Sequence, residues 1–416
     1  MRRVVFLSFV VVSWALVWCT RDKTPLGPVE RAGLCPQQEI PWPSIANSPW
    51  PMMWADPQCT ARGKYPGARL GKVVWGFAPV RMDGECVNVA VAGDCTIYWA
   101  ARVTGALQLT LFVIGMDGRE RARVPLGPKY QDSSSPILLA HGSVLVIGCR
   151  DGAFYEYTRD GQVGTPFCLG RSYELTGPGV GLDGTIYLHP REDHLFLAVN
   201  PQGQVVWTNT EKAGIRKATG TWLSMSPDGQ RLYALVEEVS GPPQLTAFDA
   251  QTGVIVWEVP VGWHAASPAV DAYGNVYCVK QGDAGKPVLA SFGPDGSLRW
   301  ESSRPVCPYT NVAIAGDGRV YAPAERGGDL LCFDCEGHLL WSVRPLFGLC
   351  SEGALVVDSE GVVYFAADRS VEAFDRDGRR LFVSEMPGNA WALHAMAIPC
   401  PGRLIVVGDA QIWCIE

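Results

Sequence analysis

The sequence has no surplus of positive charge and, after residue 66, no helical period in its apolar residues. Its 35 Lys and Arg are outnumbered by 42 Asp and Glu, which gives a net charge of −7. An acidic chain is a poor partner for nucleic acid and for an anionic membrane surface, so we exclude both kinds of electrostatic binding. The Gly-x-Ser-x-Gly, His-Glu-x-x-His and glycine-rich phosphate-loop motifs are also absent, which argues against the enzyme classes that use them.

The sequence also lacks an apolar run of the length that crosses a bilayer comfortably. The first 18 residues contain two arginines and then a short uncharged run, which is typical of a secretory signal peptide rather than a transmembrane helix. Cys19 and the polar residues after it resemble the lipobox and tether of bacterial lipoproteins, although Trp18 stands where a small residue is usual. We expect export to the periplasm or cell surface, with Cys19 as the lipidation candidate. Plain secretion and a retained anchor are the alternatives, and loss of the two arginines leaves a net charge of −9.

Repetition and turn residues dominate the rest of the chain, which holds 46 Gly and 31 Pro. Four segments run from Gly to Trp, namely GQVVW at 203–207, GVIVW at 253–257, GSLRW at 296–300 and GHLLW at 337–341. Ahead of three of them stand GTIY at 184–187, GNVY at 274–277 and GRVY at 318–321, and phrases such as LTAFDAQTG lie between. Gly and Asp-Gly supply the positive φ that tight hairpins need. A period of about forty residues with four short strands predicts β-propeller blades.

The last strands of the units give the number of blades. Clear copies end at Trp207, Trp257, Trp300, Trp341 and Phe382, and weaker copies start at Gly118 and Gly161. The segment 392–416 then supplies three strands without a fourth, while GKVVW at 71–75 is a last strand with none before it. We predict that Gly71 to Trp75 completes the final blade, which would remove an exposed sheet edge. The fold class is then an all-β, eight-bladed propeller of four-stranded antiparallel blades over residues 66–416, with seven blades as the alternative.

These repeats resemble a known family. The phrase Ala247-x-Asp249-x-x-x-Gly253-x-x-x-Trp257 resembles the tryptophan-docking repeat of the pyrroloquinoline quinone dehydrogenase-like propellers, an eight-bladed superfamily. The segment 48–62, SPWPMMWADPQCTAR, is similar to one that precedes the first strand in many bacterial proteins with such repeats. The resemblance implies that the repeated aromatic residues pack between neighbouring blades against small residues. The blade-docking residues expected on this basis are Trp75, Trp207, Trp257, Trp300, Trp341 and Phe382.

Because the superfamily includes quinone-dependent dehydrogenases, catalysis has to be considered. Those enzymes typically carry a disulfide between adjacent cysteines against the cofactor, and this sequence has no Cys-Cys pair. Cys332-x-x-Cys335 is followed by Glu336 rather than by the His of a haem attachment site. We assign no catalytic or cofactor-binding residue and expect no cofactor. Pyrroloquinoline quinone with calcium is the alternative.

One polar cluster could hold a metal ion. It lies in a connection of the third blade and consists of His189, Arg191, Glu192, Asp193 and His194. A solvated loop is the commoner setting for such residues, and we therefore assign no metal site. Asp-Gly pairs such as Asp228-Gly229 and Asp377-Gly378 are interpreted as hairpin turns rather than calcium loops.

The 14 cysteines divide by their place in the repeats. Cys332 and Cys414 occupy the slot that Ala198 and Ala247 hold in other units, and Cys278 also takes a small packed position, so we expect these three to be free thiols. No local disulfide is expected between Cys332 and Cys335, because their side chains should point to different sides. The cysteines in less regular segments could form disulfides whose pairing stays open, and these are Cys35, Cys59, Cys86, Cys95, Cys307 and Cys350.

The segment before the propeller is rich in proline. Residues 19–41 are predicted to be an extended tether after the signal peptide at 1–18. Residues 42–65, which we call the strap, contain Trp42, Trp50 and Trp54 and are too apolar for a free linker. We expect residues 42–60 to pack along the propeller, and a partner-binding segment is the alternative.

Two classes of function follow. The first is an exported, monomeric, noncatalytic scaffold that binds envelope proteins or glycans and touches the membrane only through a lipid on Cys19. In size and organisation such a chain resembles the propeller lipoprotein of the outer-membrane barrel-assembly machinery. The second is a quinone-dependent oxidoreductase with an atypical cofactor pocket. Fold resemblance alone does not choose between them.

Overall fold

The computed structural model describes residues 34–79, 89–103, 108–129, 134–148, 152–170, 177–189, 196–209, 215–217, 222–238, 241–262, 267–283, 285–325, 328–346, 354–388, 393–408 and 411–416. The predicted signal peptide and Cys19 lie outside this set. Within it the chain forms only strands and turns, and no helix has the length and apolarity to cross a membrane.

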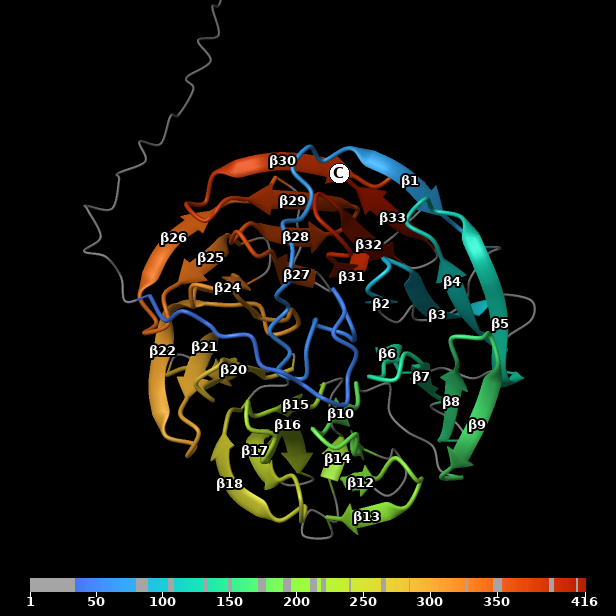
Figure 1. The fold of residues 1–416 in the computed structure, drawn as a ribbon. Helices are drawn as coiled ribbons and strands as arrows, with labels where there is room; N and C mark the ends of the chain where they lie inside the picture. The colour runs from blue at the N-terminus through green and yellow to red at the C-terminus, as the bar shows by residue number, and fades with distance from the viewer. Residues whose placement is uncertain are drawn as a thin grey trace, which may run out of the picture. The chain divides into compact units, whose positions relative to one another are not determined.

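The strands build eight antiparallel sheets that succeed one another around a ring (Figure 1). We number the blades along the chain, and their strands run from the centre of the ring outward. Blade 1 holds β2 (Val89–Val91), β3 (Ile97–Val103), β4 (Gln108–Ile114) and β5 (Glu120–Lys129). Blade 2 holds β6 (Ile137–Leu138), β7 (Val144–Ile147), β8 (Ala153–Tyr157) and β9 (Val163–Cys168). Blade 3 holds β10 (Gly179–Val180), β11 (Ile186–Leu188), β12 (Leu197–Val199) and β13 (Val205–Thr208).

The next three blades follow the same plan. Blade 4 holds β14 (Ile215–Lys217), β15 (Ser224–Met225), β16 (Arg231–Glu238), β17 (Gln244–Asp249) and β18 (Ile255–Pro260). Blade 5 holds β19 (Ala269–Val270), β20 (Val276–Gln281), β21 (Pro287–Phe292) and β22 (Leu298–Pro305). Blade 6 holds β23 (Ala313–Ile314), β24 (Val320–Pro323), β25 (Leu330–Phe333) and β26 (Leu339–Val343). In blade 4 the innermost position is shared, because β14 and β15 pair with different ends of β16.

The last two blades contain the ends of the propeller. Blade 7 holds β27 (Ala354–Val357), β28 (Val363–Ala367), β29 (Ser370–Phe374) and β30 (Arg380–Glu385). Blade 8 holds β31 (Leu393–Ala397), β32 (Leu404–Gly408), β33 (Ile412–Ile415) and β1 (Val73–Phe77).

Blade 8 joins the two ends of the propeller. Its outermost strand β1 pairs antiparallel with β33, with Trp75 opposite Cys414 and Phe77 opposite Ile412. The backbone N–H of Leu70 also donates to the carbonyl oxygen of Glu416, at 3.0 Å. The predicted all-β fold, its eight blades and the closure by the strand at residues 71–75 are confirmed.

A common register explains why the blade repeat has its residues where it does. In blades 3 to 7 a tyrosine of the second strand pairs with a small residue of the third, which pairs with an aromatic residue of the fourth. In blade 4 these residues are Tyr233, Ala247 and Trp257, and the two rings lie 5.7 Å apart. A small residue is needed between two large rings on one face of a sheet, because cross-strand neighbours share that face. The described residues of the inner strands are mostly buried, whereas outer strands such as β18 alternate between half-buried and exposed residues.

Candidate functional site: seams and strap of the ring

The aromatic residues predicted to dock between blades lie at the seams of the ring. The indole N–H of Trp207 in blade 3 donates to the carbonyl oxygen of Ala250 in blade 4 at 2.9 Å. The ring packs against Gly253 in the β17–β18 turn, where a Cβ atom would stand 2.4 Å from the indole. Gly253 also has φ of +72°, so both the space and the backbone conformation call for glycine.

The other predicted docking residues make the equivalent contact with the next blade. The pairs are Trp75 with Gly118, Trp257 with Gly296, Trp300 with Gly337, Trp341 with Gly378, and Phe382 with Gly71. Each of these four indoles donates its N–H to a backbone carbonyl of the same turn at 2.9–3.0 Å. The Trp of each of these repeats therefore packs against the turn glycine of the repeat that follows it.

The sequence analysis missed one docking residue, and it missed one seam that lacks the contact between an aromatic ring and a glycine. Phe167 at the end of the weak second repeat packs against Gly203 of blade 3, where a Cβ would stand 2.5 Å from its ring. At the seam between blades 1 and 2, a Cβ built on Gly161 would meet, among the described residues, just the Tyr157 hydroxyl at 3.8 Å. The signal for Phe167 was present as the final aromatic residue of GQVGTPF, but its spacing from the glycine differs from that of the other repeats.

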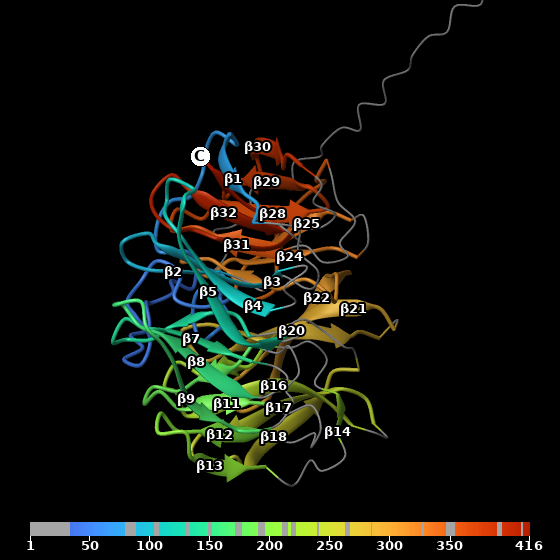
Figure 2. The same cartoon turned by 90° about the vertical axis from the view of Figure 1, so that its right-hand side faces the viewer.

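The strap lies at one end of the ring, and in Figures 1 and 2 it is part of the blue chain. Between residues 50 and 61 its backbone carbonyls accept N–H hydrogen bonds from the last residue of the innermost strand in six blades, at 2.7–2.9 Å. The pairs, taken along the strap and around the ring, are Trp50 with Val91, Pro51 with Leu138, Pro57 with Met225, Gln58 with Val270, Thr60 with Ile314, and Ala61 with Val357.

The strap reaches the other two blades through side chains. In blade 3 the Trp42 indole N–H donates to the carbonyl oxygen of Val180 at 3.0 Å. In blade 8 the side chain of Ile398 packs so closely on Gly63 that a Cβ there would lie 2.7 Å from it. Six buried backbone hydrogen bonds at about 1 kcal/mol each are comparable with the whole stability of an ordinary domain. The strap is therefore part of the folded core rather than a detachable arm.

Four strap residues other than glycine have positive φ. They are Trp54 at 56°, Ala55 at 74°, Cys59 at 56° and Ala61 at 54°. Each costs on the order of 1 kcal/mol, so the surrounding contacts must impose this backbone path. Trp50, Met53, Trp54 and Ala55 are all buried in one core together with the inner strands of several blades.

Asp56 organises the turn of the strap. Its carboxylate accepts the backbone N–H of Thr60 at 3.0 Å and also the Thr60 hydroxyl. This contact gives a physical reason for the Asp-Pro-Gln-x-Thr phrase in the sequence. Desolvation raises the pKa of Asp56, although the positive charge of Arg62 opposes the shift. Burial likewise lowers the pKa of Arg62.

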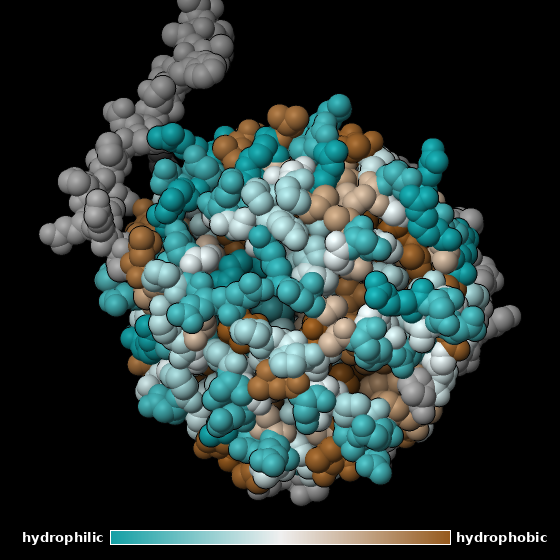
Figure 3. Space-filling view, viewed as in Figure 1, coloured by the Kyte–Doolittle hydropathy of each residue, from teal (hydrophilic) through white to brown (hydrophobic). Residues whose placement is uncertain are grey.

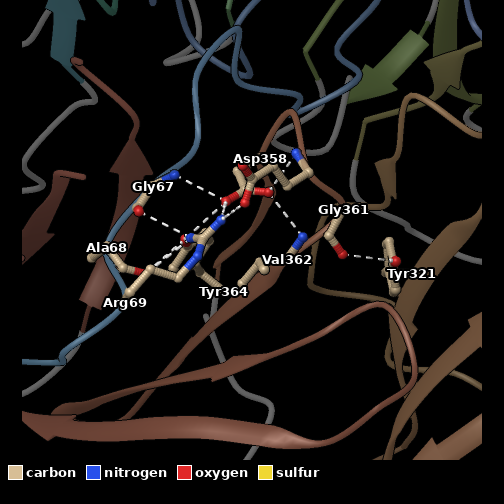
Figure 4. Close-up of polar contacts among 9 residues, drawn as sticks. Gly67, Ala68, Arg69, Tyr321, Asp358, Gly361, Val362 and Tyr364 are labelled. Carbon is tan, nitrogen blue, oxygen red and sulfur yellow. Dashed lines mark hydrogen bonds and ion pairs between the residues drawn. The ribbon is translucent and has the colours of Figure 1, made fainter. Parts of the chain in front are cut away.

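The end of the strap is continued by an anchor on blade 7 (Figure 4). Asp358, whose side chain is fully buried, accepts the backbone N–H of Gly67 at 2.9 Å and pairs with Arg69 at 2.7 Å. The Tyr364 hydroxyl lies 3.1 Å from the same carboxylate oxygen and 2.9 Å from the carbonyl oxygen of Ala68. The other oxygen of Asp358 accepts two N–H groups of its own turn. The carboxylate thus connects blade 7 to the chain just before β1.

A disulfide fixes the chain ahead of the strap. Cys35 is bonded to Cys335 in the β25–β26 turn, and its N–H donates to the carbonyl oxygen of Asp317 at 3.1 Å. The Gln37 N–H donates to the carbonyl oxygen of Gly316. Contacts with the ring therefore begin before residue 42, inside the segment that the sequence indicated as tether. Of the other cysteines in less regular segments, Cys307 is also disulfide-bonded.

The cysteines assigned to packed positions lie where the repeats place them. Cys332 pairs with Trp341 and Cys414 pairs with Trp75, as Ala247 pairs with Trp257. Both are buried free thiols, as is Cys278. Cys59, for which a disulfide was conceivable, is a buried free thiol, while Cys86 and Cys350 lie outside the described residues.

The predicted polar cluster is only partly described, because residues 190–195 fall outside the set. His189 is buried, with its ring 4.8 Å from that of Phe196, so the expectation of a solvated loop is wrong for this residue. It lies directly after the short strand β11, which places it in the core. Among the described residues no group of His, Cys, Asp and Glu is arranged to hold a metal ion.

The outer surface combines polar and apolar areas. Polar side chains cover much of the strapped face, and apolar ones appear at several places around the rim (Figure 3). On β13 and β18 of the adjacent blades 3 and 4, or directly beside them, four valines are about half exposed, namely Val205, Val206, Val254 and Val256. Within the described part of the chain, the outermost strand of each blade pairs with another strand on one side only.

A family model described as outer membrane protein assembly factor BamB matches residues 191–316 and 285–412, which together make up more than half of the chain. A search of curated protein sequences finds no match.

Solved structures share the fold. BamB from Moraxella catarrhalis is 16% identical, with a TM-score of 0.55, over 82% of this chain and 98% of its own. A europium-containing methanol dehydrogenase is 12% identical, with a TM-score of 0.60, over 86% of this chain and 88% of its own. The C-terminal WD40 domain of Sif2 is 12% identical, with a TM-score of 0.59, over 85% of this chain and 99% of its own. At such identities these three structures establish the fold alone.

Proposed function

The chain belongs to the pyrroloquinoline-quinone-like β-propeller family whose model is described as outer membrane protein assembly factor BamB, and from this membership we propose that it is a noncatalytic scaffold that binds proteins at a bacterial envelope. The observation that carries the proposal is the match over residues 191–412, which covers the two outer strands of blade 3, blades 4 to 7 and the two inner strands of blade 8. The uncharged run after Arg2 and Arg3, followed by Cys19, supports export and a lipid anchor.

The exposed valines of blades 3 and 4 favour a protein partner over a glycan. Aliphatic side chains at the rim lose water when a protein surface covers them, whereas sugars are usually held by polar groups and aromatic faces. We therefore place the partner contact on Val205, Val206, Val254 and Val256, which are 45–53% exposed.

The scaffold role is tested by deleting the gene in its native host and measuring the amount of folded outer-membrane protein. We expect a reduction that the native chain restores and that a Val206→Lys, Val256→Lys variant does not. Leu298→Lys, which changes a similarly exposed residue on blade 5, is the matched control and should restore the amount. Unchanged amounts after deletion would contradict an assembly role, and full rescue by the valine variant would contradict the placement of the contact.

The lipid anchor is tested by metabolic labelling with a fatty acid in a bacterial host. The native chain should incorporate label and sediment with membranes, and Cys19→Ser should do neither. Cys168→Ser, at an exposed cysteine of β9, is the control for nonspecific acylation. Equal labelling of the native chain and the Cys19 variant would refute the anchor at this residue.

Quinone-dependent oxidation is the alternative function. At the strapped end, Trp50, Met53 and Trp54 are buried among the inner strands, so a planar quinone would have to displace them. This burial supports the noncatalytic proposal. Titration with pyrroloquinoline quinone and calcium, followed by a dye-linked assay, decides the question, because saturable binding with turnover would overturn the noncatalytic proposal.

A further inference from the structure

One hairpin of the ring departs from the backbone chemistry of the other seven. The turn between the first and second strands of a blade has a residue of positive φ two positions before the second strand. In blades 2 to 8 that residue is glycine, at positions 142, 184, 229, 274, 318, 361 and 402, with φ between 68° and 95°. In blade 1 it is Cys95, with φ of 64°.

A side chain at this position has a cost. A residue other than glycine in the left-handed region is strained, and the region is disfavoured for cysteine. The N–H of Cys95 donates to the carbonyl oxygen of Ala92 at 2.9 Å, so the turn keeps the hydrogen bond found in the glycine-containing turns of blades 2 to 7 in spite of the strain. Strain held at one copy of a repeat and absent from the others points to a role for the side chain itself.

The Cys95 side chain faces a second cysteine. Its Sγ lies 3.6 Å from the carbonyl oxygen of Pro399, the residue directly before Cys400. Cys400 lies in the corresponding hairpin of blade 8, between β31 and β32, and strands β2 and β31 are neighbours. Both thiols are partly exposed, whereas Cys59, Cys278 and Cys332 are buried. The two cysteines therefore stand on either side of the seam between the first and last blades, within reach of a small oxidant.

We propose that Cys95 and Cys400 form a disulfide that covalently joins blade 1 to blade 8. A low-molecular-weight disulfide is the oxidant. One thiolate of the pair attacks it and releases one small thiol, and the second thiolate then attacks the mixed disulfide and releases the other. Two protein thiols lose two protons and two electrons, and one molecule of the small disulfide is reduced to two thiols.

The bond would act where the ring is closed by noncovalent contacts. The seam of blade 8 depends on β1 pairing with β33, and a covalent link across the neighbouring hairpins keeps the first and last blades together if that pairing opens. This role is independent of any partner. The chain already contains a long-range disulfide between Cys35 and Cys335, so the same oxidant chemistry suits its fold.

The test uses the purified full-length chain in a series of oxidised and reduced glutathione buffers, followed by alkylation, trypsin and mass spectrometry. The expected product is peptide 82–102 linked to peptide 381–403, with the loss of two alkylatable thiols. Burial, and then the neighbouring Cys95, raise the pKa of Cys400 to about 11, so the reaction should run faster at pH 9 than at pH 7.

Three variants make the test specific. Peptide 82–102 also contains Cys86, and Cys86→Ser should retain the link. Cys400→Ser and Cys95→Gly should abolish it. Cys95→Gly installs the residue of the other seven turns, so it should fold at least as well as the native chain and keeps the test valid if a serine variant does not fold. Oxidation should raise the Tm of the native chain and leave that of Cys95→Gly unchanged.

The outcomes separate cleanly. A 95–400 link that appears in oxidising buffer and disappears in Cys95→Gly supports the proposal. Retention of both thiols when the small thiols in the buffer are fully oxidised would overturn it, as would a link that persists in Cys95→Gly because it runs through Cys86.

Discussion

At the scale of single residues, each blade depends on a glycine that belongs to the next one. The Trp of a repeat contacts the Tyr and the small residue of its own blade, and its outer face packs on the glycine turn that follows in the ring. Trp207 is 9% exposed and has both a hydrogen bond and a close ring contact across the seam. Each such repeat therefore supplies two matched positions, a Trp that packs on the next blade and a turn glycine that the Trp of the previous blade contacts.

Gly253→Ala and Gly402→Ala provide a matched pair of substitutions. Both glycines have φ near +73°, so alanine costs about 1 kcal/mol of backbone strain at either. Only Gly253 faces an indole, and a Cβ at Gly402 meets no atom within 4 Å. Gly253→Ala should therefore lower the free energy of unfolding by roughly 2 kcal/mol more than Gly402→Ala, measured by urea unfolding. Equal losses would show that the seam yields to the extra methyl group.

Asp56 should give the strap an unusual dependence on pH. Its folded-state pKa is raised above the unfolded value of about 3.9, so the folded chain holds the proton more tightly. Its contribution to stability is fully present below that unfolded pKa and is lost as the pH rises through the folded-state pKa. Asp56→Asn cannot titrate there. The stability of the native chain relative to this variant should fall as the pH is raised above about 4, as measured by urea midpoints, and a rise would refute the assignment.

At the scale of elements, the strap packs into the core together with the eight blades. It supplies acceptors to the innermost strands, whose inner edges have no further strand of their own blade, and its ends are held by the Cys35–Cys335 disulfide and by Asp358. A segment without regular structure can be rigid when each of its carbonyls meets a fixed donor.

Asp358→Asn and Asp271→Asn test the anchor. The two carboxylates occupy the same turn in blades 7 and 5 and both accept N–H groups of that turn and a tyrosine hydroxyl. Asp358 in addition pairs with Arg69 and binds the Gly67 N–H. Asp358→Asn should therefore lower the free energy of unfolding by about 2–4 kcal/mol, and Asp271→Asn by less.

Hydrogen exchange gives a second readout for this pair. Asp358→Asn should speed exchange of the Gly67 amide, because Asp358 accepts the hydrogen bond of that amide. Asp271→Asn should leave the exchange of this amide unchanged. Equal effects of the two variants on stability and on this amide would mean that the anchor to the strap contributes nothing beyond the turn.

At the scale of the whole molecule, the ring is closed by a short strand from the start of the propeller. Strand β1 lies at the edge of blade 8 and takes its hydrogen bonds from β33, the last strand of the chain. Closure of this kind couples the first and last blades, and it removes an edge at which chains could otherwise associate.

Truncation tests the closure. A chain ending at Gln411 lacks β33, so β1 has no partner and the edge of β32 is open. We expect it to form oligomers in size-exclusion chromatography and to unfold at lower temperature. A chain ending at Ile415 retains β33 and loses the Glu416 contacts with Leu70, Lys72 and Arg403, so it should remain monomeric. A monomeric Gln411 truncation with an unchanged Tm would contradict closure by strand pairing.

The sequence by itself determined the blades, their number and the strand that closes the ring. Hairpin glycines and alternating apolar residues determine the conformation of a few neighbouring residues, so they can be recognised in the sequence. Eight copies of the same pattern support the propeller prediction even where a single copy such as GRERARV is weak. The slot shared by Ala247, Cys332 and Cys414 was readable for the same reason.

Only the tertiary structure decided the path of the strap, the partner of Cys35, the anchor at Asp358 and the neighbourhood of Cys95 and Cys400. Each of these joins residues that are hundreds of positions apart, and none repeats along the chain. Their pairing depends on which hairpins the closed ring brings to the same end, and no local preference of the backbone encodes that geometry.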